Sequence, residues 1–110
     1  MVEFTIVGAP YMVLNGGPGF THSPATSISV LTEDQAETDS LWEALVDGGA
    51  EGQCGWLEDR FGISWQIVPE AMPRMLADDD RESAGRVQQA MMKMGKIDIA
   101  QLEAAFRGSK

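Results

Sequence analysis

Residues 53–69, with the sequence QCGWLEDRFGISWQIVP, carry the clearest structural pattern in this chain of 110 residues. Apolar and polar side chains alternate in two runs, 53–58 and 62–68, and a turn-forming segment, 59–62, separates them. Proline cannot donate to a strand ladder, so Pro69 ends the second run. The pattern predicts an antiparallel β-hairpin.

The second strand of this hairpin has two chemically different faces. Alternate side chains of a strand point to opposite sides, so Ile63, Trp65 and Ile67 form a strongly apolar face. This face is expected to pack beneath a helix. Ser64 and Gln66 point the other way, and Gln66 is expected to face a polar cavity.

Three more strands are predicted on the N-terminal side of this hairpin. Residues 2–7 and 11–15 flank a turn signal at residues 8–10 (Gly-Ala-Pro), which predicts a first hairpin. Residues 25–31 form another short strand. The small polar face of that strand carries Ala25, Ser27 and Ser29.

A helix is predicted between these strands and the hairpin, over residues 33–47. Thr32-Glu33-Asp34-Gln35 has the spacing of a capping box, with a hydroxyl followed three residues later by an amide. Gly48-Gly49 is the stop signal. The apolar stripe of the helix is predicted at Leu41, Ala44 and Leu45, with Trp42 at its margin.

The rest of the chain, residues 70–110, is predicted to be a helical extension of the same domain. A short helix spans 70–77, with Pro73 in its first turn. A second helix spans 81–94 after an acidic capping run, and a third begins after Asp98.

Composition limits the possible functions. The chain has 17 acidic and 8 basic residues and a net charge of −9, whereas nucleic-acid and anionic-membrane surfaces need basic patches. Cys54 is the only cysteine, so no internal disulfide can form, which suits the cytosol. No apolar run reaches about 18 residues, and the N-terminus lacks the pattern of a signal peptide. The sequence predicts a cytoplasmic protein of one domain.

Several segments resemble, in the same order, the PhnB-like branch of the vicinal oxygen chelate superfamily, which includes glyoxalase and bleomycin-resistance proteins. Members of this branch are often labelled 3-demethylubiquinone-9 3-methyltransferase domains. The matching segments are residues 14–18 (LNGGP), 34–37 (DQAE), 54–57 (CGWL), 59–62 (DRFG), 64–69 (SWQIVP) and 91–99 (MMKMGKIDI). The resemblance implies an α+β fold of the glyoxalase-like type, built from βαβββ modules.

The chain departs from this family pattern in two ways. It lacks the strand, helix and strand with which relatives usually begin, so residues 1–69 are expected to hold a partial first module, the hairpin, followed by a second module. A truncated chain, a misplaced start and a naturally short form all remain open. The positions that match metal ligands of relatives hold Ala25 and Gln66, which leaves too few ligands. We therefore expect no metal and no other cofactor.

Six side chains are candidates for a small-molecule site, because strand alternation could aim them at one concave surface away from the helix. Sheet-surface residues bonded only to water would show the same pattern. The six are Asn15, Ser27, Ser29, Trp56, Ser64 and Gln66. His22 could act as a general base, but a lone loop histidine is usually a bystander. Cys54 fits a half-buried core position, so no catalytic residue is assigned.

Three functions remain open. The chain could be a metal-free enzyme or enzyme remnant, a protein that sequesters a ligand as bleomycin-resistance relatives do, or a structural module. Methyl transfer rests on the family label alone, because no glycine-rich strand–loop–helix for a methyl donor is visible. Unpaired strand edges in an incomplete module favour a homodimer or a swapped assembly.

Overall fold

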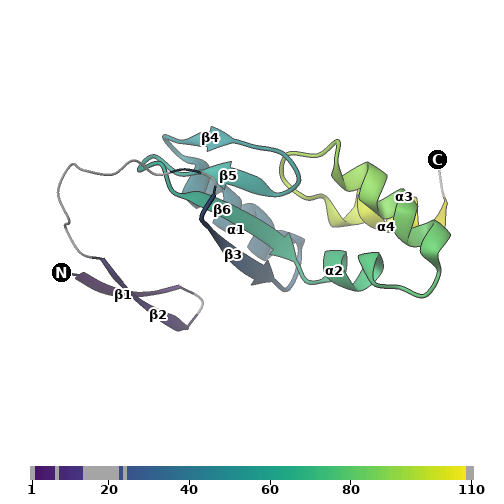
Figure 1. The fold of residues 1–110 in the computed structure, drawn as a ribbon, viewed down its shortest axis with the longest axis horizontal. Coiled ribbons are helices and arrows are strands. Elements are labelled where there is room, and N and C mark those ends of the chain that lie inside the picture. The colour runs from purple at the N-terminus through teal and green to yellow at the C-terminus, as the bar shows by residue number, and fades with distance from the viewer. Residues whose placement is uncertain (1, 7, 14–22, 24, 109–110) are drawn as a thin grey trace.

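The computed structural model describes residues 2–6, 8–13, 23 and 25–108. Its strands form a two-stranded hairpin near the N-terminus and a four-stranded sheet in the middle of the chain (Figure 1). The elements are β1 Val2–Ile6, β2 Ala9–Val13, β3 Ser27–Thr32, α1 Gln35–Val46, β4 Ala50–Glu51, β5 Trp56–Glu58, β6 Ser64–Pro69, α2 Ala71–Leu76, α3 Arg81–Met91 and α4 Ile99–Arg107. The predicted α+β class is confirmed.

The four-stranded sheet is mixed, with the strand order β3-β6-β5-β4. β3 runs parallel to β6, with Ser27 opposite Ser64 and Thr32 opposite Pro69. β5 and β6 are the antiparallel pair predicted from residues 53–69. β6 therefore lies between a parallel and an antiparallel neighbour.

The first strand of the predicted hairpin begins at Trp56 rather than at residue 53. The two residues before it turn the chain with positive φ angles, 59° at Cys54 and 84° at Gly55. Their amides donate to the carbonyls of Met94 and Gly95, both at 2.8 Å. These two amides, which were predicted to lie in a strand, thus bind the loop between α3 and α4 instead.

The N-terminal hairpin is confirmed with a tighter turn than predicted. β1 and β2 pair antiparallel, with Ile6 opposite Ala9. Gly8, whose φ is 81°, lies in the reversal, where glycine is favoured. Pro10 therefore lies within β2 opposite Thr5 instead of in the turn. Both strands of a two-stranded sheet are edge strands, where proline is tolerated.

The predicted capping box at the start of α1 is wrong. The N-cap is Asp34, whose Oδ1 accepts a hydrogen bond from the amide of Glu37 at 2.8 Å. Thr32 is the last residue of β3, and its hydroxyl pairs with the buried hydroxyl of Thr38 at 2.6 Å. The sheet fixes Thr32, so the next suitable oxygen along the chain caps the helix.

The apolar stripe of α1 is centred differently from the prediction. Trp42 is only 3% exposed and belongs to the core, whereas Ala44 is exposed. The indole nitrogen of Trp42 donates to Glu51 Oε1 at 3.1 Å, which satisfies its polar atom. Burial of this large ring sets the rotation of α1 over the sheet. As predicted, Gly48, with φ of 78°, follows the end of the helix.

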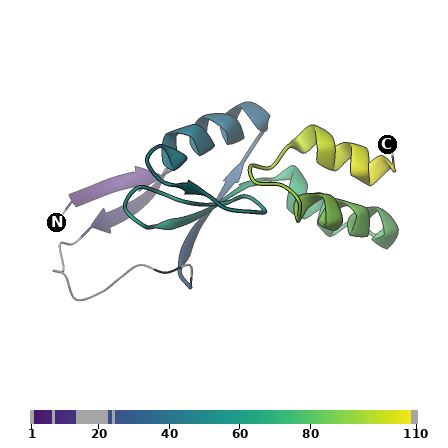
Figure 2. The ribbon, with the colours of Figure 1, turned by 90° about the horizontal axis from the view of Figure 1, so that it is seen from above.

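Two hydrophobic clusters form the core of the described chain from β3 to α4. The first lies between α1 and the sheet and consists of Val30, Trp42, Leu57, Trp65 and Ile67. The second joins the C-terminal helices and consists of Met72, Val87, Met94, Ile97 and Leu102. Figure 2 shows α1 along the sheet and the C-terminal helices beyond one end of it. β6 connects the two clusters, because Ile67 belongs to the first and Val68 packs against the second.

The predicted helical extension is confirmed as three short helices. Pro73 lies in the first turn of α2. Asp80 caps α3 and Asp98 caps α4, each accepting a hydrogen bond from a backbone amide three residues later. Gly108 ends α4 in the left-handed conformation, with φ of 77°.

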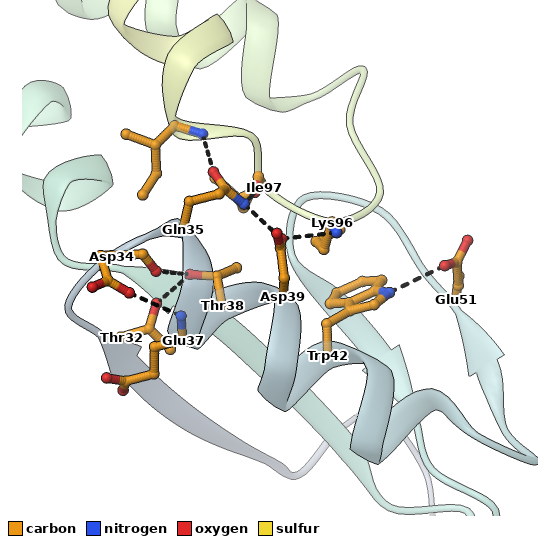
Figure 3. A network of polar contacts seen from close by, with 11 residues as sticks. Thr32, Asp34, Gln35, Glu37, Thr38, Asp39, Trp42, Glu51, Lys96 and Ile97 are labelled. Atoms are coloured by element: carbon orange, nitrogen blue, oxygen red, sulfur yellow. Dashed lines mark hydrogen bonds and ion pairs between the residues drawn. The ribbon is translucent and has the colours of Figure 1, made fainter.

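Gln35, in the first turn of α1, fastens the loop before α4 to the sheet domain (Figure 3). Its Nε2 donates to the carbonyl of Ile97 at 3.0 Å, and its Oε1 accepts from the amide of Ile99 at 2.7 Å. The same Nε2 also donates to Asp39 Oδ1 at 2.9 Å. One side chain therefore satisfies backbone groups that lie more than sixty residues away along the chain.

An ion pair adds to this contact between α1 and the loop before α4, which is called the joint below. Lys96 Nζ lies 2.8 Å from Asp39 Oδ1. The hydrogen bond from Lys96, followed by that from Gln35, lowers the pKa of Asp39, and the bond to Asp39 raises the pKa of Lys96. The carboxylate contributes stability above its unfolded pKa and loses it as pH falls through the lowered folded pKa. The ammonium contributes below its unfolded pKa and loses it as pH rises through the raised folded pKa.

We predict that Ile67→Ala strongly destabilises the protein. Ile67 is fully buried at 0% exposure, so the substitution leaves a cavity beneath α1 and should lower the free energy of unfolding by about 2–5 kcal/mol. Urea denaturation measures the change. Leu31→Ala on the neighbouring strand is the control, since Leu31 is 58% exposed. Equal losses in the two variants would contradict the described core.

We also predict that Gln35→Ala weakens the joint between the sheet and the helices. The substitution leaves the Ile97 carbonyl and the Ile99 amide without their side-chain partner and should lower the free energy of unfolding by about 1–3 kcal/mol. Gln89→Ala, on the exposed side of α3, is the matched control. Indistinguishable denaturation midpoints for the two variants would refute the role given to Gln35.

Candidate functional site

One face of the four-stranded sheet packs against α1. On the opposite face Val68 of β6 packs against the second hydrophobic cluster, and the rest of that face is called the open face below. Val30, Leu57, Trp65 and Ile67 lie on the face that packs against α1. Alternation turns their neighbours to the opposite face, where Leu31 is 58% exposed. This open face is where the described sheet can meet a ligand.

Gln66 lies at the centre of the open face. In the strand register it stands between Ser29 of β3 and Trp56 of β5. Its amide nitrogen donates to Ser27 Oγ at 2.8 Å. Gln66, Ser27 and Trp56 are half-buried, while Ser29 is exposed. The open face thus brings five of the six candidate side chains together on three adjacent strands, because Ser64 lies two residues before Gln66 in β6 and opposite Ser27.

A small hollow borders this group at the side of β5. Its volume is about 230 Å³, and Trp56 and Ser64 are among the residues that line it. Ser64 is only 6% exposed and lies opposite Ser27 in the strand register. Ligand pockets usually have at least about 300 Å³, so this hollow alone would hold only part of a typical ligand.

Glu58 is a candidate residue that the sequence reasoning missed. It pairs with Ser64 across β5 and β6, lines the hollow and is exposed. It lies two residues after Trp56 in the same strand, so alternation alone places both side chains on one face. Glu58 adds a carboxylate to hydroxyl, amide and indole groups.

The other tryptophans have structural partners. Trp65 Nε1 donates to Asp59 Oδ2 at 2.9 Å. Asp59 Oδ1 accepts the amides of Phe61 and Ile63, which ties Trp65 to the hairpin turn. Trp42 is held by Glu51, as described above. Trp56 is therefore the one tryptophan placed on the open face.

Other residues considered from the sequence lie elsewhere. Asn15 and His22 fall outside the described residues. Ala25 precedes β3, and its methyl group has no ligating atom. Cys54 is half-buried in the turn before β5. In the described part of the chain, no group of three or more His, Cys, Asp or Glu side chains is placed to hold a metal ion. The expectation of a metal-free site stays a prediction.

A family model described as 3-demethylubiquinone-9 3-methyltransferase matches residues 1–68. A solved structure from Bacillus cereus, described as "Putative 3-demethylubiquinone-9 3-methyltransferase, PhnB protein", is 30% identical to this chain, with a TM-score of 0.56. Protein PA1353 from Pseudomonas aeruginosa is 22% identical, with a TM-score of 0.51, and shows similarity of fold alone.

These matches cover part of each protein. The two structural alignments span 61% of this chain, and 61% and 59% of the respective solved chains. The family model ends before α2 begins. No curated protein matches the chain. Among the described residues, no helix has the length and apolar character needed to cross a membrane.

Proposed function

The chain belongs to the 3-demethylubiquinone-9 3-methyltransferase family, in its PhnB-like branch, and from that premise we propose that it binds a small organic molecule on the open face of its four-stranded sheet. The observation that carries the proposal is the bond from Gln66 to Ser27, which fixes an amide and a hydroxyl from two strands beside each other. A few convergent polar groups on a partly apolar surface are what such a site requires.

Trp56 supplies the apolar part of the proposed site. It is half-buried and stands opposite Gln66 in the register of β5 and β6. An indole at this position offers a flat surface for an apolar or ring-shaped group, while the amide of Gln66 sets orientation through hydrogen bonds. We therefore expect a ligand with a flat apolar part and at least one hydrogen-bonding group.

We propose that a second copy of the chain covers the open face and completes the ligand site. The hollow beside Trp56 and Ser64 measures only about 230 Å³. β3 forms an outer edge of the sheet, and an edge strand carries backbone groups that another chain can pair with. A homodimer or a swapped assembly would enclose the open face and protect this edge.

Ligand binding and catalysis place different demands on Glu58. A protein that only sequesters a ligand needs the shape and hydrogen bonds of the face, and loses little when Glu58 becomes glutamine. An enzyme needs a group that moves a proton, and the carboxylate of Glu58 is a candidate for that group on the open face. Sequestration is the alternative function. The effect of Glu58→Gln on ligand binding and on turnover distinguishes sequestration from catalysis.

Methyl transfer is outside the proposed function. In the described chain, two connections lead from a strand of the large sheet into a helix, residues 33–34 and Glu70. Neither contains glycine, whereas methyl-donor sites of the Rossmann type use a glycine-rich strand-to-helix turn. The family name is therefore the only support for this activity.

A thermal-shift screen against a metabolite panel tests the proposed site. A ligand at 100 times its dissociation constant should add roughly 2.7 kcal/mol to the free energy of unfolding. Gln66→Leu should abolish that shift, because it removes the amide at the centre of the face. Gln89→Leu, on the exposed side of α3, should leave it intact.

Two outcomes of this screen would count against the proposal. A shift that survives Gln66→Leu would place the ligand elsewhere. A shift produced by Ni²⁺, Zn²⁺ or Mn²⁺ alone and lost in Gln66→Leu would overturn the expectation of a metal-free site. Among confirmed ligands, chemical turnover that Glu58→Gln abolishes, with binding retained, would establish catalysis over sequestration.

The assembly is tested separately by light scattering. We expect the mass of a dimer at micromolar concentration, since each chain leaves a sheet face and the β3 edge for its copy. Lysine substitution at Leu31, which is 58% exposed on that face, should shift the equilibrium towards monomer by placing charge in the contact. A stable monomer of the unmodified chain would refute the assembly.

A further inference from the structure

A second cavity lies between α2 and α4. Its volume is about 360 Å³, within the size range of small-molecule sites. Its lining includes Arg74, Met75, Asp78, Glu103, Phe106 and Arg107. All of them lie beyond the part of the chain that the family model matches.

The apolar wall of this cavity is firmly anchored. Met75 and Phe106 are half-buried and pack against the second hydrophobic cluster. Arg86 of α3 holds the last turn of α4, donating to the carbonyls of Ala105 and Phe106, both at 2.8 Å. The wall therefore exists before any ligand arrives, which keeps the entropic cost of binding low.

Four charged side chains surround this apolar wall, two of each sign. Arg74 and Arg107 provide guanidinium groups, and Asp78 and Glu103 provide carboxylates. In the described chain the ion pairs are Arg86–Glu82 and Lys96–Asp39, so these four charges do not pair with one another. Positive and negative groups thus border one cavity without neutralising each other.

An adjoining cavity makes the distribution of charge along the groove uneven. It measures about 460 Å³ and shares Arg74 and Glu103 with the first. Three more carboxylates line it, those of Glu33, Asp34 and Asp98. The combined groove is therefore acidic at the end near the start of α4, while Arg107 marks the other end. A ligand that complements the shared part, where Arg74 and Glu103 line both cavities, carries a positive and a negative group close together beside an apolar body.

We propose that this groove binds a small zwitterion with an apolar body, of the class of aromatic or large aliphatic α-amino acids. The carboxylate of the ligand pairs with Arg107 and Arg74, and its ammonium group pairs with Glu103, which lines both cavities. The side chain of the ligand packs on Met75 and Phe106. This site is separate from the open face of the sheet.

Three probes that differ by one charged group test the proposal by isothermal titration. Phenylalanine carries both charges, phenylacetate lacks the ammonium group, and phenethylamine lacks the carboxylate. Phenylalanine should bind tightest, with each of the others weaker by about tenfold or more, as expected for one lost charged hydrogen bond.

Matched variants assign each charge to its partner. Arg107→Gln should weaken phenylalanine and phenylacetate but leave phenethylamine unchanged, and Glu103→Gln should weaken phenylalanine and phenethylamine but leave phenylacetate unchanged. Arg60→Gln, in the hairpin turn, is the control that should change none of them. Circular dichroism verifies that each exposed substitution leaves the helices intact.

The remaining outcomes overturn the proposal. These are the absence of saturable phenylalanine binding at millimolar concentration, equal affinity for all three probes, and affinity that neither Arg107→Gln nor Glu103→Gln changes. Binding lost in Gln66→Leu and retained in Arg107→Gln would place the ligand on the open face of the sheet instead. That result would refute the groove while supporting the other site.

Discussion

The parallel pairing of β3 with β6 is the constraint on which the rest of this structure depends. Parallel strands cannot be joined by a tight turn, so the chain between Thr32 and Ser64 must cross over the sheet. The crossover carries α1, which buries Trp42 on one face, and then β4 and β5, which extend the sheet on the far side of β6. One crossover helix covers one face. The open face, where Gln66 meets Ser27, is therefore a product of the topology.

Local patterns predicted most elements of the fold, because hydrophobic period, turn residues and helix caps act over a few positions. The hairpin at 53–69 and the caps Asp80 and Asp98 follow from their immediate neighbours. The errors arose where a distant element decided the outcome. Thr32 cannot cap α1 because β6 holds it in the sheet. Cys54 leaves the predicted strand because its amide binds the loop before α4.

The candidate site could be predicted only in part for the same reason. Alternation within single strands indicates that Ser27 and Gln66 each point away from the core. It does not indicate that they touch, because their contact depends on the register between strands thirty-nine residues apart. Alternation along β5 also places Glu58, two residues after Trp56, on the open face. The groove between α2 and α4 has no local signal, since it forms only when the two helices pack.

Gln35 has a further consequence for motion within the molecule. Its side-chain amide offers one donor and one acceptor to the segment from Ile97 to Ile99, as an adjacent backbone strand would. When that segment moves away from α1, the Gln35 side chain, the Ile97 carbonyl and the Ile99 amide lose these hydrogen bonds together. Backbone fluctuations of the sheet and of the helical extension are therefore coupled, and solvent exchange of the Ile99 amide reports on both. A chain with two hydrophobic cores can in this way behave as one cooperative unit.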